Sequence, residues 1–263
     1  MRTERGRQMT RSIRLAAALA VVLIGSTVVA FAEVEEVFDQ TYPIAPDGRI
    51  SLDNVNGDVT VEVWDQAEVH VSAVKRAGDA ERLAALKIEV TSRDRSLDIH
   101  TELPSSRGWG WGDHGRTEVE YTLTVPRGAR LDGFDLVNGD LRIGPVEGGI
   151  EVDSVNGRVE IEAAFAPLEL STVNGTMDIR LARLEPGADV DLDSVNGRIE
   201  LALPPGAGAE LDVETVNGSI RNDFGLEVHK GKYVGSDLRA DLNGGGARVA
   251  VETVNGSIRL TDR

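Results

Sequence analysis

The tripeptide Val-Asn-Gly occurs seven times in this chain of 263 residues, and this repetition constrains the fold more than any other feature. The successive spacings are 82, 18, 18, 22, 21 and 38 residues, and we interpret the last as two periods with one degenerate copy between them. Repetition near this length is typical of stacked units that bury apolar faces against one another. The copies begin at Val55, Val137, Val155, Val173, Val195, Val216 and Val254.

Apolar and polar residues alternate on both sides of each tripeptide, as in the copy at residues 149–163. This alternation predicts a half-buried strand on each side. The inward residues Val152 and Val159 are an odd number of positions apart, so the strand must bend or bulge between them. Asn and Gly suit such a corner because they tolerate positive φ. We therefore predict structural corners at Asn56, Gly57, Asn138, Gly139, Asn156, Gly157, Asn174, Gly175, Asn196, Gly197, Asn217, Gly218, Asn255 and Gly256.

The predicted fold is all-β, a single-stranded β-helix or solenoid with coils of ~20 residues. An antiparallel meander is the alternative, because Asn-Gly is also a strong hairpin signal. The domain spans residues 33–263, with regular coils at 137–263 and a less regular part at 33–136. That part carries a small hairpin-plus-short-helix elaboration. Its predicted elements are a helix at 79–87 and strands at 68–74, 86–91, 96–103 and 117–125.

Residues 1–32 have the pattern of a secretory signal peptide. Five arginines precede an apolar run that ends in Ala30-Phe31-Ala32, which predicts cleavage after Ala32. The expected location is the periplasm, the cell surface or the extracellular space. The alternative is a retained N-terminal anchor, and only then would the chain contact a membrane.

Charge and composition exclude several kinds of partner and chemistry. Residues 33–263 carry 23 basic and 43 acidic residues, a net charge of −20, which argues against nucleic acid. The chain has no Cys, so disulfides and thiolate chemistry are excluded. Its four His residues form no close-spaced ligand pattern, and no phosphate-binding or nucleophile motif is present. We therefore expect no catalytic residue, no metal and no cofactor.

The chain resembles the bacterial putative-adhesin family of β-strand-repeat proteins, a domain of unknown function. The resemblance rests on the repeated VNG, on TVPRGARL at 124–131, on NGSIRNDFG at 217–225 and on GGGARVAVETVNGSIRL at 244–260. It implies an exported or envelope protein with a β-helical fold that binds an envelope protein or a glycan, or serves as a scaffold. The alternative function is a polysaccharide-active lyase or hydrolase on a β-helix, which would need its carboxylates grouped on one coil.

Acidic residues recur two positions before the repeat valine in six of the seven copies. They alternate with the inward residues and therefore face solvent on one sheet. We interpret this acidic column first as a solubility feature and second as a surface for a divalent cation or a cationic partner. The column consists of Asp53, Asp135, Asp153, Ser171, Asp193, Glu214 and Glu252, of which Asp153, Asp193, Glu214 and Glu252 are the candidate binding residues.

Trp109 and Trp111 form a second candidate binding site, in a Gly-rich loop at 105–116. Exposed Trp is favoured at binding hot spots and stacking surfaces. The alternative is that both rings fold back over the end of a coil.

The final coil, residues 248–260, is followed by only three residues. An uncovered last coil exposes strand edges, and so predicts a weak homodimer through the C-terminal coil. Alternatively, residues 222–247 fold back and cover that edge.

Overall fold

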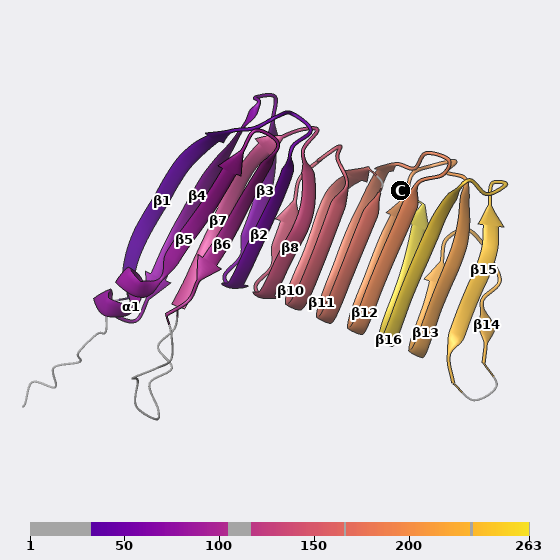
Figure 1. Ribbon diagram of the computed structural model, residues 1–263. Coiled ribbons are helices and arrows are strands. Elements are labelled where there is room, and N and C mark those ends of the chain that lie inside the picture. The colour runs from indigo at the N-terminus through magenta and orange to yellow at the C-terminus, as the bar shows by residue number, and fades with distance from the viewer. Residues whose placement is uncertain (1–32, 105–116, 166, 232–233, 263) are drawn as a thin grey trace, which may run out of the picture. The chain divides into compact units, whose positions relative to one another are not determined.

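Strands dominate the computed structural model, which describes residues 33–104, 117–165, 167–231 and 234–262. Within these residues the strands form one sheet that does not close (Figure 1). The all-β class is therefore confirmed, whereas the β-helix or solenoid stays a prediction. The elements are β1 (Val34–Pro43), β2 (Arg49–Asn56), β3 (Val59–Trp64), β4 (Glu68–Ala77), α1 (Ala80–Ala85), β5 (Lys87–Arg93), β6 (Ser96–Glu102), β7 (Thr117–Pro126), β8 (Arg130–Asn138), β9 (Leu141–Ile143), β10 (Ile150–Phe165), β11 (Leu168–Arg183), β12 (Asp189–Leu203), β13 (Ala209–Asn222), β14 (His229–Lys230), β15 (Ser236–Leu242) and β16 (Ala247–Asp262).

The repeats form parallel strands in register. Strands β10, β11, β12, β13 and β16 each run through one Val-Asn-Gly tripeptide. Asn156 lies opposite Asn174, and Asn174 lies opposite Asn196, so identical residues stack from strand to strand. The antiparallel meander is therefore contradicted for the repeats. Antiparallel pairs occur at both ends of the sheet, between β1, β4 and β7, between β5 and β6, and between β13, β15 and β14.

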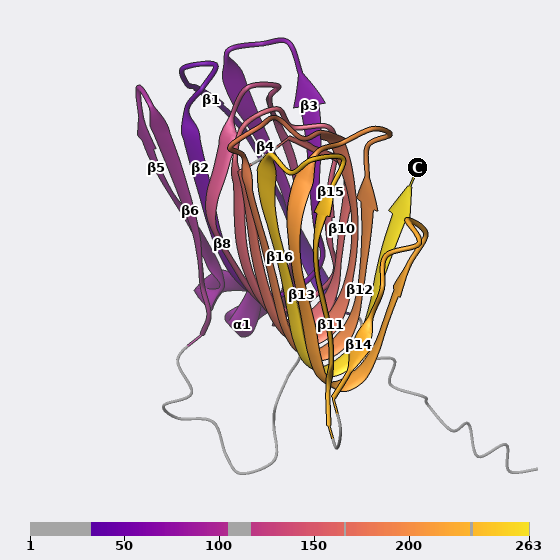
Figure 2. The same cartoon turned by 90° about the vertical axis from the view of Figure 1, so that its right-hand side faces the viewer.

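Each repeat strand bends at the tripeptide, and both of its arms face one apolar core. In β10, Ser154 is the last buried residue before the bend and Val159 is the first one after it. Five positions separate them, so the two-residue alternation changes phase at the bend. Figure 2 shows the repeat strands folded into a V with two arms. Ile150 and Ile161, one from each arm, belong to the same core cluster.

The last strand of the chain is not the last strand of the sheet. Strand β16 lies between β12 and β13, with Val251 opposite Leu192 on one side and Val213 on the other (Figure 1). Both of its edges are paired, so the prediction of an uncovered edge at the final coil is wrong. The predicted homodimer depended on an unpaired edge at that coil, so the structure gives no support for it.

The segment that follows β13, described for residues 223–231 and 234–246, covers the first arm of β13 instead. Strand β15 pairs antiparallel with the first arm of β13, from Ala209 to Thr215. Phe224, Leu226 and Val228 pack against the core next to it. In the described residues, the 38-residue spacing therefore holds this covering segment, with β14 and β15, where the sequence predicted a degenerate copy of the repeat.

A ladder of asparagine side chains follows the bend across the sheet. Each Asn in turn donates a hydrogen bond from its Nδ2 to the Oδ1 of the Asn on the preceding strand, over distances of 2.9–3.2 Å. The order of the ladder is the order of the strands in the sheet and differs from the order in the chain. It runs Asn56, Asn138, Asn156, Asn174, Asn196, Asn255 and Asn217.

The corner glycines are required mainly because the strands stack closely there. A Cβ at Gly197 would overlap the carbonyl oxygen of Gly175, and one at Gly256 would overlap that of Gly197. Positive φ, the reason inferred from the sequence, holds only at Gly57, Gly139 and Gly157 among the seven corner glycines. None of the ladder asparagines has positive φ, so Asn is used for its side-chain amide. The physical reason inferred from the sequence is therefore corrected, to close stacking for the glycines and side-chain hydrogen bonding for the asparagines.

The irregular N-terminal part contains the predicted helix in shorter form. Helix α1 begins after Asp79, whose Oδ1 accepts a hydrogen bond from the Arg82 backbone N at 2.8 Å. The buried Lys75 on β4 donates to the Leu86 carbonyl at 3.2 Å and pairs with Glu36 at 2.8 Å. The hydrogen bond to Leu86, the C-cap residue, fastens the end of the helix to the sheet.

Residues 1–32 lie outside the described part of the chain, so the signal peptide stays a prediction. No helix within the described ranges has the length and apolar character needed to cross a bilayer.

The direction of the asparagine ladder gives a stability prediction. Asn174→Asp removes the amide that donates to Asn156, so it should lower the free energy of unfolding by about 1 kcal/mol. Asn56→Asp adds the same charge, but among the described residues the Asn56 side chain only accepts, from Asn138. It should therefore cost much less. Urea denaturation of both variants measures the difference, and equal losses would contradict a directional ladder.

Candidate functional site

The acidic column is continuous across seven strands. Asp53 on β2 lies opposite Asp135, and Asp135 lies opposite Asp153. The column continues through Ser171 and Asp193 to Glu252 and then Glu214, in the strand order of the sheet. The candidate residues Asp153, Asp193, Glu252 and Glu214 are therefore brought together on one surface, with Glu252 before Glu214 because β16 lies inside the sheet.

A column of exposed valines runs beside the acidic column. These are the repeat valines, and five of them, Val155, Val173, Val195, Val216 and Val254, are 37–49% exposed. Exposed valines stacked at this regularity form an apolar strip on an otherwise polar surface. This strip was not predicted from the sequence. The two-residue spacing between each acidic position and the following valine nevertheless indicates that both face the same side of the sheet.

The two columns form the walls of a groove of about 990 Å³. Between them lie residues such as Ser154, Thr172 and Ser194, whose side chains are buried on the opposite face. Their backbone therefore forms the floor of the groove. Val234 and Arg239, from the segment that covers β13, line one end, and His100 on β6 lines the other. The groove thus crosses the strands from β2 to β13.

Side chains of the chain itself pair with both ends of the acidic column. His100 Nδ1 lies 3.0 Å from Asp53 Oδ2. At the other end, Arg239 pairs with Glu214 and also with Asp212. Within the described ranges, Asp135, Asp153, Asp193 and Glu252 form no ion pair, so the middle of the column carries uncompensated negative charge.

Partial burial and neighbouring negative charge both raise pKa values along the column. Partial burial raises the pKa of Asp135, and a hydrogen bond with Asp53 together with the charges of Asp53 and Asp153 raises it further. Burial followed by the charge of Asp191 raises the pKa of Asp193. Burial followed by the charges of Asp193 and Glu214 raises the pKa of Glu252. Each of these carboxylates is less readily ionised in the folded chain than in water.

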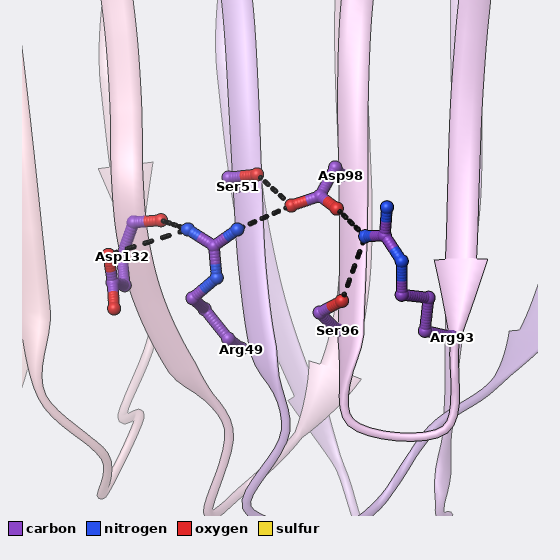
Figure 3. A network of polar contacts seen from close by, with 6 residues as sticks. All are labelled: Arg49, Ser51, Arg93, Ser96, Asp98 and Asp132. Carbon is purple, nitrogen blue, oxygen red and sulfur yellow. Dashed lines mark hydrogen bonds and ion pairs between the residues drawn. The ribbon is translucent and has the colours of Figure 1, made fainter.

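A second polar cluster lies where β2, β5, β6 and β8 meet (Figure 3). Asp98 accepts hydrogen bonds from Arg49 at 2.6 Å, from Arg93 at 2.7 Å and from Ser51 at 2.9 Å. Arg49 also contacts Asp132, at 3.6 Å between Nη1 and Oδ1. Two arginines thus face two aspartates. This balanced network ties four strands together and leaves little net charge for a ligand.

The other predicted features are not brought into the groove. Trp109 and Trp111 lie outside the described residues. In the ranges that the structure describes, no group of three His, Cys, Asp or Glu side chains is arranged to hold a metal ion. Ser154 and Ser194 are 5% exposed, so their hydroxyls are poorly accessible to a substrate.

Comparisons with solved structures return alignments of low sequence identity and low TM-score. No family model matches the chain, and no curated protein matches it. A putative cell adhesion protein from Clostridium sporogenes aligns at 12% identity with a TM-score of 0.47, covering 88% of this chain and 100% of its own. A putative adhesin from Bacteroides fragilis aligns at 11% identity with a TM-score of 0.32, covering 86% of this chain and 97% of its own. A putative lipid binding protein from Parabacteroides distasonis aligns at 12% identity with a TM-score of 0.23, covering 86% of this chain and 96% of its own. The resemblance to the repeat family, which no family model matches, stays a prediction.

The raised pKa values predict how the acidic column affects stability. A carboxylate whose folded pKa is raised destabilises the fold once it is ionised, and this cost disappears below its ordinary pKa of about 4. Asp193→Asn should therefore raise the free energy of unfolding at pH 7, by about 0.5 kcal/mol, because it removes a partly buried charge that Asp191 on the same strand repels. The gain should vanish as the pH falls towards 4.

Urea denaturation at pH 7 and pH 4 measures this effect. Glu62→Gln removes an exposed carboxylate on β3, outside the column, and serves as the matched control. A loss of stability for Asp193→Asn at pH 7 would contradict the repulsion.

Proposed function

We propose that this chain is an exported cell-envelope or secreted protein that binds a partner or acts as a scaffold, in the manner of an adhesin, without catalysis. The partner is an envelope protein or a glycan-bearing component that presents positive charge. The observation that carries this proposal is the groove across β2–β13, which combines a column of carboxylates with a column of exposed valines. We interpret the parallel repeat strands as coils of a solenoid that presents this groove.

The arrangement of the carboxylates favours binding over catalysis. An acid–base enzyme needs a few groups of different pKa converging on one bond. Here one carboxylate recurs on almost every strand, and the neighbouring valines repeat with it. Repetition at the strand spacing suits an elongated partner that makes the same contact several times.

Export is the other part of the proposal. It is supported by the charge pattern and the Ala-Phe-Ala site of residues 1–32. The strongly negative charge of residues 33–263 favours a cationic partner over nucleic acid. Contact with a membrane is part of the proposal only for a retained N-terminal segment.

Direct binding to the envelope tests this function. The purified chain, fluorescently labelled, is titrated with an envelope fraction of the producing cell. We compare it with the groove triple variant Asp153→Asn/Asp193→Asn/Glu252→Gln. The groove variant should bind at least about tenfold more weakly, because each central carboxylate contributes to charge complementarity.

The matched control is the triple variant Glu151→Gln/Glu169→Gln/Asp191→Asn. It removes three charges from the outward column two residues earlier on β10, β11 and β12, which does not line the groove. It should bind like the unmodified chain. Equal envelope binding by all three proteins would remove the groove from the proposed function.

A further inference from the structure

We propose that the groove binds a linear aliphatic polyamine, a chain of ammonium groups joined by short methylene linkers. Its ammonium groups would pair with the acidic column while its methylene groups lie along the valine column. This inference rests on the proposed function, because it concerns the same groove and names a polyamine as the positively charged group that the envelope partner presents there.

The charge pattern of the acidic column indicates where the ligand lies. Its first carboxylate, Asp53, is paired with His100, and its last, Glu214, is paired with Arg239. The four carboxylates between these ends have no ion-pair partner in the described part of the chain. They are Asp135, Asp153, Asp193 and Glu252, with the hydroxyl of Ser171 in the middle. This stretch therefore offers four carboxylates over five strand positions. A ligand that matches the strand spacing over four consecutive positions pairs three ammonium groups with carboxylates and places one beside Ser171.

The spacing of these positions favours a polyamine over an extended peptide. Adjacent strands lie about 4.8 Å apart, and this fixes the distance between successive positions of the column. Two ammonium nitrogens joined by a three-carbon linker are about 5 Å apart, since four bonds of about 1.5 Å separate them. Side chains on one face of an extended peptide repeat only every ~6.8 Å. The spacing of charges in the polyamine thus matches the spacing of the acidic column over several strands, whereas the side-chain spacing of a basic peptide does not.

The valine column explains why the ligand should be aliphatic. Val155, Val173 and Val195 are 37%, 41% and 42% exposed, each beside one position of the acidic column. Methylene linkers bury apolar area against such side chains, whereas a hydrated divalent cation gains nothing from them. Acid and valine together therefore select a chain that alternates charge with hydrocarbon.

Isothermal titration calorimetry on the purified full chain at low salt tests this inference. The probe is norspermine, the linear tetraamine with three-carbon linkers. Mg²⁺ and an oligolysine peptide are titrated in parallel as cations without that spacing. Norspermine should bind the unmodified chain at least about tenfold more tightly than Mg²⁺, and its affinity should fall with added salt.

Two variants separate the contributions of the columns. The groove triple variant Asp153→Asn/Asp193→Asn/Glu252→Gln should lose at least about tenfold in norspermine affinity, while the matched triple Glu151→Gln/Glu169→Gln/Asp191→Asn should lose little. The variant Val155→Thr/Val173→Thr/Val195→Thr keeps the side-chain shape and removes the apolar wall. It should weaken norspermine several-fold and leave Mg²⁺ unchanged. Circular dichroism confirms that each variant is folded.

Equal weakening by the two acidic triple variants would mean a diffuse counterion effect and would overturn the inference. If the valine substitutions leave the norspermine affinity unchanged, the proposed contact between methylene groups and valines is wrong. Binding of oligolysine without norspermine would reject the polyamine but leave the groove as a binding surface. Failure of both probes, with unaltered envelope binding by the groove variant, would reject the inference and the groove-binding function together.

Discussion

The asparagine ladder is the interaction on which the rest of the structure depends. Six amide hydrogen bonds connect seven strands at the bend, and the stacked glycines beside them leave room only for a neighbouring carbonyl. Together they hold the register, because a slip of one residue would place Asn opposite Val or Gly and would turn each side chain to the other face. A parallel sheet with this register necessarily aligns every repeat position into a column.

The groove follows from that alignment. The alternation of buried and exposed residues changes phase at the bend, between Ser154 and Val159. The acidic residue and the repeat valine both precede the bend, two positions apart, so both lie on the outer face. Each added strand extends both columns by one residue. Partial burial, together with neighbouring carboxylates, raises the pKa values of Asp135, Asp193 and Glu252. Stacking in register contributes by placing Asp153 beside Asp135 and Glu252 beside Asp193 and Glu214. The same regularity that costs stability provides a linear array of charges for a ligand.

Local features were predictable from the sequence, whereas strand order was not. Alternation around each tripeptide predicted the strands, the bend and the outward acidic column, because parity along one strand determines which face a side chain takes. The insertion of β16 between β12 and β13 depends on how residues 222–247 return, and repeat spacing carries no information about that path. Positive φ was an incomplete reason for the corner residues. The hydrogen bond of the Asn174 amide and the close approach at Gly197 are contacts between strands, which the pattern along one strand does not show. The column of exposed valines follows from the same two-residue alternation, but it was not predicted as a surface feature.

The measurement that tests this account most directly is the set of nuclear Overhauser contacts among asparagine side-chain amide protons. The ladder predicts that Asn255 contacts both Asn196 and Asn217, which come earlier in the chain, and that Asn196 does not contact Asn217. Contacts that follow chain order, with Asn217 directly beside Asn196, would contradict the strand order and the continuous groove built upon it.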